Sequence, residues 1–332
     1  MDSPKKPRAV RRSFLYAALA TLGGVMALPS VQAQTWPSKP VRLVVPFAAG
    51  GPADSLGRFI AGRLSAELGQ TVVIDNKAGA GGTLGASDVI RATDGHSFLF
   101  ASTGAMVIFP AISPSPNYRP DRDLVAVGQA VNTPGVVVVS AKSKFAKHED
   151  LIAFAKANPG RLNYASAGNG TSTHLGIELL KREAGVFMTH IPYRGASPAI
   201  TDLISGTVDT MFADVPAVVN FIESGQLRGL AVADAKRSPA LPNIPTTAEV
   251  GFKNIIGGTW YGLLGPTSTP PEVVQKLNTA LNKVLQQPET LAFFRTQGVA
   301  AAAGTPQDFT KFIHSESTKW ASVVRSSGIK PD

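Results

Sequence analysis

The chain has 332 residues, a formal net charge of +9 and no cysteine. The lack of cysteine excludes disulfides, thiolate metal sites and a cysteine nucleophile, so an apolar core must hold the fold together. Hydrophobic residues make up 44% of the chain, which suffices for such a core, and the length favours two domains. No block of basic residues follows the N-terminal segment, which argues against a nucleic-acid partner and favours weak steering of small anions.

The first 33 residues have the pattern of a secretory signal peptide. Basic residues between Lys5 and Arg12 precede an apolar stretch at 14–28, and Val31-Gln32-Ala33 offers a cleavage site. That stretch is shorter than the ~20 residues that a membrane-spanning helix needs. Arg11-Arg12 also fits a twin-arginine signal, so the export route stays open. We expect a periplasmic protein whose mature chain begins at residue 34.

Short apolar runs then alternate with segments of helical period, which is typical of an α/β fold. After a first strand at 41–45, apolar residues from Leu56 to Leu68 recur at helical spacing behind Asp54, which we expect to cap this helix. Further strands are expected at 71–74, 97–101, 136–140, 163–165, 189–192, 210–213, 229–232 and 260–264. Helices are expected at 151–157, 175–182, 197–204 and 273–285, with a last one from Thr305-Pro306 onward.

Two short segments, 132–135 and 255–258, are candidate crossings between domains, because each combines glycine with residues that favour turns or flexible strands. If both are hinges, residues 34–133 and 257–332 form lobe 1 around an inserted lobe 2. Lobe 2 would then comprise residues 134–256.

Two glycine-rich loops each follow an expected strand and open an expected helix. They contain Gly50-Gly51 and Gly168-Asn169-Gly170, one in each expected lobe. The first N–H groups of a helix lack partners within it, and glycine lets a small anion approach them closely. We therefore expect a cleft that holds a carboxylated solute, with simple tight turns as the alternative.

Other functions find little support in the motifs. The segment Gly79–Gly85 resembles a dinucleotide fingerprint, but Leu84 occupies the third small position, and neither glycine loop carries the lysine of a P-loop. Ser102 and Ser166 do not lie in a G-x-S-x-G elbow, and the histidines lack metal-ligand spacing. We expect no catalytic residue, metal or cofactor. His174, in the first turn behind the second loop, is expected to donate to that loop or to the ligand.

Four further residues are candidates for the ligand site. Asp214 ends an expected strand, where α/β sheets bind ligands, although a turn cap is an equal alternative. Tyr193 is the aromatic residue best placed to close over a solute. Arg194 and Arg58 carry charges that suit a carboxylate, but Arg58 lies one helical turn inside and is expected on a solvated face.

Several segments together resemble the successive signatures of one family: 45–54, 75–82, 166–175, 192–199, 206–209, 237–251 and 260–271. The chain is similar to the Bug family, the TctC-type periplasmic solute-binding receptors of tripartite tricarboxylate transporters. The similarity spans essentially the whole mature chain. Lys77 and Ala78 depart from the arginine and proline usual in the 75–82 segment, which we interpret as a packing turn before a helix.

The resemblance implies a type II periplasmic-binding-protein fold. In this fold two α/β lobes are joined by a two-segment hinge and grip carboxylates mostly through backbone groups and water. Position by position, it implies ligand-binding roles for Phe47, Ala49, Gly50, Gly51 and Asp54 in the first loop and for Ser166, Gly168, Gly170, Thr171 and Ser172 in the second. It implies cleft-wall roles for Ser102, Thr103, Tyr193 and Asp214.

The sequence thus predicts an extracytoplasmic receptor, not an enzyme. It would act as a monomer that captures a small carboxylate and delivers it to the membrane permease of a tripartite tricarboxylate transporter. A carboxylate sensor for a signalling partner and a periplasmic hydrolase are the alternatives. Di- and tricarboxylates, acidic or amidated amino acids, and nicotinate-like or aromatic acids all suit two N–H-lined loops.

Overall fold

The structure is a computed structural model that describes residues 1–3, 36–113, 118–255 and 257–327. Residues 4–33 of the expected signal peptide lie outside the described residues. The strands are β1 (Val41–Val45), β2 (Val72–Asn76), β3 (Ser97–Ser102), β4 (Leu124–Ser140), β5 (Asn163–Ser166), β6 (Thr189–Pro192), β7 (Thr210–Asp214), β8 (Leu227–Ala233), β9 (Gly258–Pro266) and β10 (Ala300–Ala301).

Helices follow most of these strands. They are α1 (Pro52–Leu68), α2 (Thr83–Ile90), α3 (Phe109–Ile112), α4 (Pro120–Asp123), α5 (His148–Ala157), α6 (Ser172–Ala184), α7 (Ala196–Ser205), α8 (Val215–Glu223), α9 (Pro271–Gln286), α10 (Pro288–Thr296) and α11 (Pro306–Ser327). Two short helical turns, η1 (Ala80–Gly82) and η2 (Gly104–Ile108), precede α2 and α3. Every strand and helix expected from the sequence is present, which confirms the α/β class. Most lie within a few residues of their predicted bounds, but the strand expected at 136–140 is only the end of β4, which begins twelve residues earlier at Leu124.

The strands that the structure describes pair in the order β2-β1-β3-β9-β4-β7-β5-β6, with β8 and β10 also paired to β4. The neighbours of β1 and of β5 run parallel to them, as expected where helices connect successive strands. The long strand β4 is antiparallel to β9 up to Pro134 and antiparallel to β7 and β8 from Gly135 onward. One strand therefore runs through both halves of the sheet.

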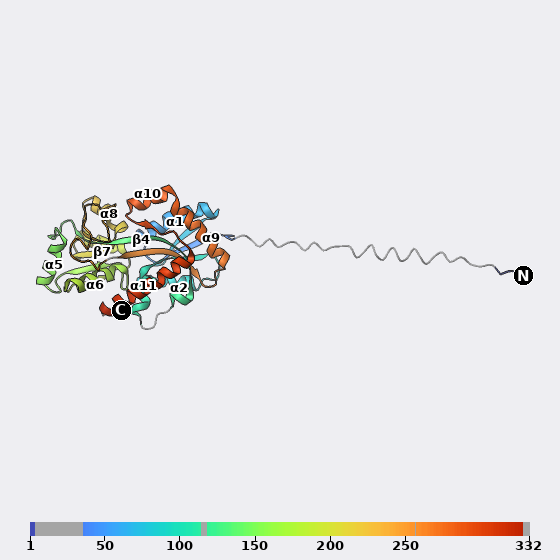
Figure 1. The fold of residues 1–332 in the computed structure, drawn as a ribbon, viewed down its shortest axis with the longest axis horizontal. Helices are drawn as coiled ribbons and strands as arrows, with labels where there is room; N and C mark the ends of the chain where they lie inside the picture. Colours follow the sequence, from blue (N-terminus) through green and yellow to red (C-terminus); the bar gives the residue numbers. More distant parts are fainter. Residues whose placement is uncertain (4–35, 114–117, 256, 328–332) are drawn as a thin grey trace. The chain divides into compact units, whose positions relative to one another are not determined.

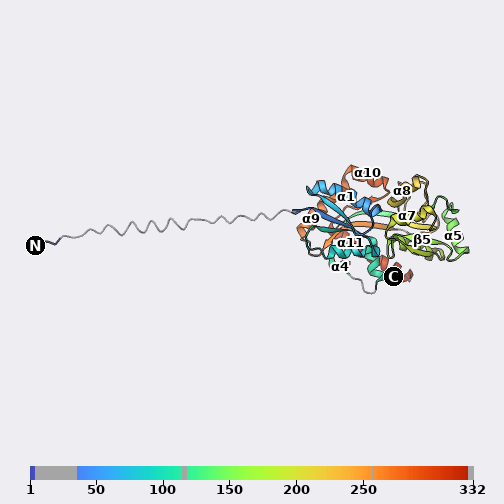
Figure 2. The same cartoon turned by 180° about the vertical axis from the view of Figure 1, so that it is seen from behind.

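Helices cover both faces of the strands (Figure 1), and the view from behind shows the same layering (Figure 2). In the half around β1, Val41, Leu43 and Val45 pack in a core with α1 and α9, whereas Val44 packs in a second core with α2 and α11. In the other half, α7 and α8 cover one face, and α5 and α6 the other. The alternation along β1 follows from the two-residue period of a strand.

The first helix begins earlier than the sequence suggested. Gly51 is its N-cap, and Pro52 and Asp54 are its first and third residues, so the prediction that Asp54 caps α1 is wrong. Proline is favoured at the first helical position because its fixed φ suits the helix and its missing N–H would lack a partner there. The 75–82 segment does turn directly into α2 through η1, as predicted.

The first predicted crossing lies beside the described end of the second, Gly257 and Gly258. Residues 132–135 lie within β4, and Gly258 begins β9 as the register partner of Pro134. A Cβ atom at Gly258 would lie 2.1 Å from the carbonyl oxygen of Thr133, so only glycine allows this close approach. The division into lobes at these crossings stays a prediction.

Candidate functional site

The first glycine loop connects β1 to α1, and the side chain of Asp54 holds it through hydrogen bonds. The N–H of Gly50, a residue with φ of 82°, donates to Asp54 Oδ2 over 3.0 Å. Arg58 Nε donates to the same oxygen over 3.0 Å, and Asn76 Nδ2 donates to Oδ1 over 2.9 Å. Burial raises the pKa of Asp54, but these hydrogen bonds outweigh it and the net pKa is lowered. Asp54 is therefore an ionised support for the loop.

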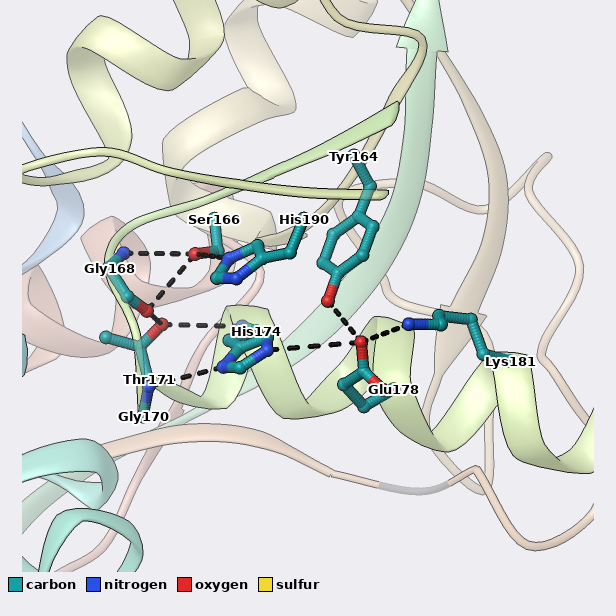
Figure 3. Close-up of polar contacts among 9 residues, drawn as sticks. All are labelled: Tyr164, Ser166, Gly168, Gly170, Thr171, His174, Glu178, Lys181 and His190. Carbon is teal, nitrogen blue, oxygen red and sulfur yellow. Dashed lines mark hydrogen bonds and ion pairs between the residues drawn. The ribbon is translucent and has the colours of Figure 1, made fainter. Parts of the chain in front are cut away.

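The second glycine loop connects β5 to α6 and is held in the same way by His174 (Figure 3). The N–H of Gly170, with φ of 69°, donates to His174 Nδ1 over 3.3 Å. Burial, together with the charges of His190 and Lys181, lowers the pKa of His174 to about 3, so the ring is neutral. The expectation that His174 donates to the loop is wrong, because its loop-facing nitrogen is the acceptor.

The two loops share one local arrangement. In each, the third helical residue reaches back to the N–H of the glycine that precedes the N-cap. This is a variant of the capping box, in which a side chain of the first turn satisfies a backbone donor outside the helix. Asp54 and His174 do the same task with different acceptor atoms.

Further polar contacts fix the second loop (Figure 3). Ser166 Oγ accepts from Gly168 N over 3.2 Å and lies 2.7 Å from His190 Nε2. Thr171, the N-cap of α6, donates through Oγ1 to Gly168 O over 2.7 Å. The His174 and His190 rings stack with their centroids 3.9 Å apart, so the loop lies on a rigid aromatic support.

A narrow cavity of about 30 Å³ lies between the two loops and the ends of β3, β7 and β9, with room for one or two water-sized groups. Six of the predicted site residues line it: Phe47, Gly51, Ser102, Thr171, Ser172 and Asp214. The sequence analysis missed the other lining residues: Ala48, Pro52, Ala53, Gly104, Ala167, Thr173, Ala196, Thr259 and Tyr261.

A larger cavity of about 550 Å³ shares Phe47 and Ala167 with the narrow one. Gly168, Tyr193 and Arg194 line it, together with η1. Tyr193 Oη donates to Asp202 Oδ2 over 2.6 Å, which fixes the ring at this wall. The two cavities are therefore neighbours on either side of Phe47 and Ala167.

The remaining predicted site residues line neither cavity: Ala49, Gly50, Asp54, Thr103, Ser166 and Gly170. Most of them support the loops as described above. Thr103 accepts a hydrogen bond from Trp260 N over 2.9 Å and so joins β3 to β9. Arg58 pairs with Asp54 on a side chain that is 54% exposed, in keeping with the predicted solvated face.

Asp214 lies at the centre of a buried polar chain on the wall of the narrow cavity. Thr259 Oγ1 donates to its Oδ1 over 2.7 Å, and Tyr261 Oη donates to its Oδ2 over 3.0 Å. Ser172 Oγ lies 2.5 Å from Thr259 Oγ1, which extends the chain to α6. Burial raises the pKa of Asp214 to about 6, although both hydrogen bonds lower it.

The turn cap that was the alternative for Asp214 is not observed, and its role in binding a ligand stays a prediction. The residue stands at the N-cap position of α8, but its side chain makes no capping hydrogen bond and is bonded to β9 instead. Tyr261 lies in the strand expected at 260–264, but Thr259 lies just before its predicted start, so the sequence did not show that the two side chains share one face of β9. What the sequence lacked was the pairing that brings β9 next to Asp214.

The described residues contain no group of three or more histidine, cysteine, aspartate or glutamate side chains that could hold a metal ion. No helix within the described ranges is both long and apolar enough to cross a bilayer.

Known structures with the same arrangement are periplasmic solute-binding proteins. Periplasmic binding protein BugD matches with a TM-score of 0.85 and 33% identity over 89% of this chain and 99% of that one. A protein from R. palustris with adipate matches with a TM-score of 0.87 and 34% identity, over 90% of this chain and 100% of that one. MatC from Rhodopseudomonas palustris with bound malate matches with a TM-score of 0.83 and 31% identity, over 87% of this chain and 100% of MatC.

The sequence relationship is equally extensive. The family model described as tripartite tricarboxylate transporter family receptor, TctC, matches residues 56–329. BugT of Bordetella pertussis is 37% identical over 314 residues, which cover 94% of this chain and 95% of BugT. The chain therefore belongs to the TctC, or Bug, family of receptors.

Proposed function

We propose that this protein is an extracytoplasmic receptor that captures a small carboxylate and delivers it to the permease of a tripartite tricarboxylate transporter. The observation that carries the proposal is the narrow cavity, onto which the N-termini of α1 and α6 both open. The first N–H groups of a helix have no partner within it, and Ala53, Ser172 and Thr173 line the cavity at those positions. Such groups favour an anion.

Family members supply the ligand class. Relatives of similar length and fold hold adipate and malate, both of them carboxylates. No lysine, arginine or histidine lines the narrow cavity among the described residues, so backbone N–H groups and hydroxyls are the available donors. A ligand held in this way is recognised by its shape and by its own charge.

The proposal includes the two lobes and the compartment. Lobe 1, of residues 34–133 and 257–332, and lobe 2, of residues 134–256, would close on the solute through the crossings at β4 and β9. The mature protein would be a periplasmic monomer after removal of residues 1–33. We propose that the protein binds its ligand without a metal or cofactor and does not convert it chemically.

A thermal-shift screen of the mature chain against a carboxylate library tests this function. A bound ligand at about 100 times its Kd should stabilise the fold by ~2.7 kcal/mol, which raises the melting temperature measurably. Proton NMR of the incubated ligand should show it unchanged. A library without any stabilising carboxylate, or a hit that is converted to product, would contradict the proposal.

A further inference from the structure

An acidic side chain, Asp214, lines the cavity that we propose binds an anion, which is unusual. The residue is only 3% exposed and lines the narrow cavity. It is the single acid among the described lining residues, and no basic side chain accompanies it there. A bare carboxylate ligand would therefore bring a second negative charge towards Asp214 in a poorly hydrated space, which is costly.

Asp214 retains unused capacity to accept hydrogen bonds. Each of its oxygens takes one donor, from Thr259 and from Tyr261, while an ionised carboxylate offers about four acceptor positions. The side chain is thus fixed in place, with lone pairs left for a donor on the ligand.

Ser102 offers the complementary function. Its side-chain oxygen is buried, lines the same cavity and has no hydrogen-bond partner within the described part of the chain. Ser102 is the register partner of Tyr261 across β3 and β9, so the two side chains lie on one face of the sheet. A buried hydroxyl without a partner costs free energy, which a ligand carboxylate at this place would recover.

We propose that Asp214 makes this receptor selective for carboxylates with a hydrogen-bond donor, a hydroxyl or an ammonium group, on the carbon next to the carboxylate. Asp214 accepts from that donor, and Ser102 donates to the carboxylate. The two groups must be adjacent because the cavity has room for only one or two water-sized groups. This inference rests on the proposed carboxylate-receptor function and names the ligands within that class.

Two matched series of probes test the selectivity by calorimetry at pH 7.5. Succinate, malate and aspartate share a four-carbon chain and differ by a hydrogen, a hydroxyl and an ammonium group. Phenylacetate, mandelate and phenylglycine form the same series on an aromatic acid. In at least one series we expect the hydroxyl- or ammonium-bearing acid to bind about tenfold tighter or more than the plain acid, as for a hydrogen bond to a charged group.

Three variants locate the effect. In Asp214→Asn, which keeps the side-chain volume, the preference should shrink to about threefold or less, because the amide lacks the charge that favours a donor. In Ser102→Ala, all acids of a series should weaken together, about fivefold to tenfold, with the preference kept. Asp121→Asn, the same change at a carboxylate that pairs with Arg119 at the surface, should leave both affinity and preference unchanged.

The outcomes separate this inference from the proposed function. If carboxylates bind but plain acids bind as tightly as their hydroxyl and ammonium partners, the inference is wrong and the receptor function stands. The same holds if none of these six probes binds although other carboxylates do, or if Asp214→Asn, folded by circular dichroism, keeps the full preference. If no carboxylate binds at all, the receptor function itself is wrong.

Discussion

Buried polar side chains, rather than exposed charges, shape this site at the scale of single residues. Asp54 and His174 are both buried acceptors, and both hold a glycine N–H in place. Asp214 is also buried, but its partners are the hydroxyls of Thr259 and Tyr261. Deeper burial raises the pKa of Asp214 more than its two hydroxyl donors lower it, whereas the three hydrogen bonds to Asp54, one of them from a guanidinium, outweigh burial and lower its pKa.

The raised pKa of Asp214 makes stability depend on pH. Burial raises this pKa to about 6, whereas the carboxyl of an unfolded chain ionises near about 4. The folded state therefore retains a proton that the unfolded state has lost, and this group's contribution to stability falls as pH rises from about 4 to 6. In Asp214→Asn this pH-dependent contribution to stability is lost, because asparagine does not ionise. Relative to wild type, the variant's free energy of unfolding should rise by about 2 kcal/mol between pH 4 and pH 7.

Urea denaturation of both proteins at several pH values measures this difference, because other titrating groups contribute equally to both and cancel. Parallel curves for the two proteins across this range would show that Asp214 titrates normally.

Gly51 is expected to be required for binding but not for folding. It has φ of −86°, so a side chain is not strained there, and a Cβ atom would lie 3.7 Å from Ala48 O. Because Gly51 lines the narrow cavity, the branched side chain of Gly51→Val would fill space that the ligand needs. We expect affinity to fall below detection while the far-UV spectrum stays native. Gly62→Val, at an open position of the same helix, serves as the control. Unchanged affinity in Gly51→Val would mean that the first loop is only a turn.

At the scale of elements, local patterns predicted most of the architecture. Apolar periodicity located the strands and helices, and proline at the first helical position marked the start of α11. The exception is the first part of β4, residues 124–135, which the sequence did not predict as part of a regular strand. This part continues β4 because β9 lies against it and Gly258 allows close contact. Such long-range pairing overrides local preference, and a single sequence does not reveal it.

The same reason explains what was missed at the site. The glycine loops were predicted because their chemistry is local. The bonds from β9 to Asp214 join residues 45 and 47 positions apart in the chain. The supports Asp54 and His174 lie four residues after their glycines, close enough to be noticed, but only the helix starts at Pro52 and Ser172 show that both reach back to the loop.

The support under the second loop can be tested by removing its acceptor. In His174→Ala the N–H of Gly170 loses its acceptor, which costs about 1–3 kcal/mol for a buried donor. We expect faster hydrogen exchange of the Gly170 amide and roughly tenfold weaker ligand binding. His174→Asn retains an oxygen acceptor and should recover part of both. Equal behaviour of the alanine and asparagine variants would show that the ring matters only through packing against His190.

At the scale of the whole molecule, the two halves of the sheet approach closely around the cavities. A Cβ atom at Gly81 would lie 2.7 Å from Asn169 O, and one at Gly104 would lie 3.2 Å from Gly170 O. We expect these contacts to separate when a solute enters or leaves the narrow cavity. We therefore expect the ligand-free protein to open at the paired crossings of β4 and β9, as in hinge closure. Small-angle scattering of the mature chain should give a smaller radius of gyration with saturating ligand than without. Identical profiles would contradict closure by a hinge.

The charge of the ligand should decide its binding. Helix N-termini provide N–H groups that favour a full negative charge, and charge-assisted hydrogen bonds are about twice as strong as neutral ones. No basic side chain among the described residues lines the narrow cavity, so the ligand's charge is recognised by N–H and hydroxyl groups alone. The amide or methyl ester of the best screening hit should therefore bind at least about tenfold more weakly than the acid, with Kd measured by calorimetry at pH 7.5. The amide is close to the carboxylate in size and shape and is the matched control, whereas the ester also adds a methyl group. Equal affinities of acid and amide would show that the two loops do not recognise a carboxylate, whatever else the cavity holds.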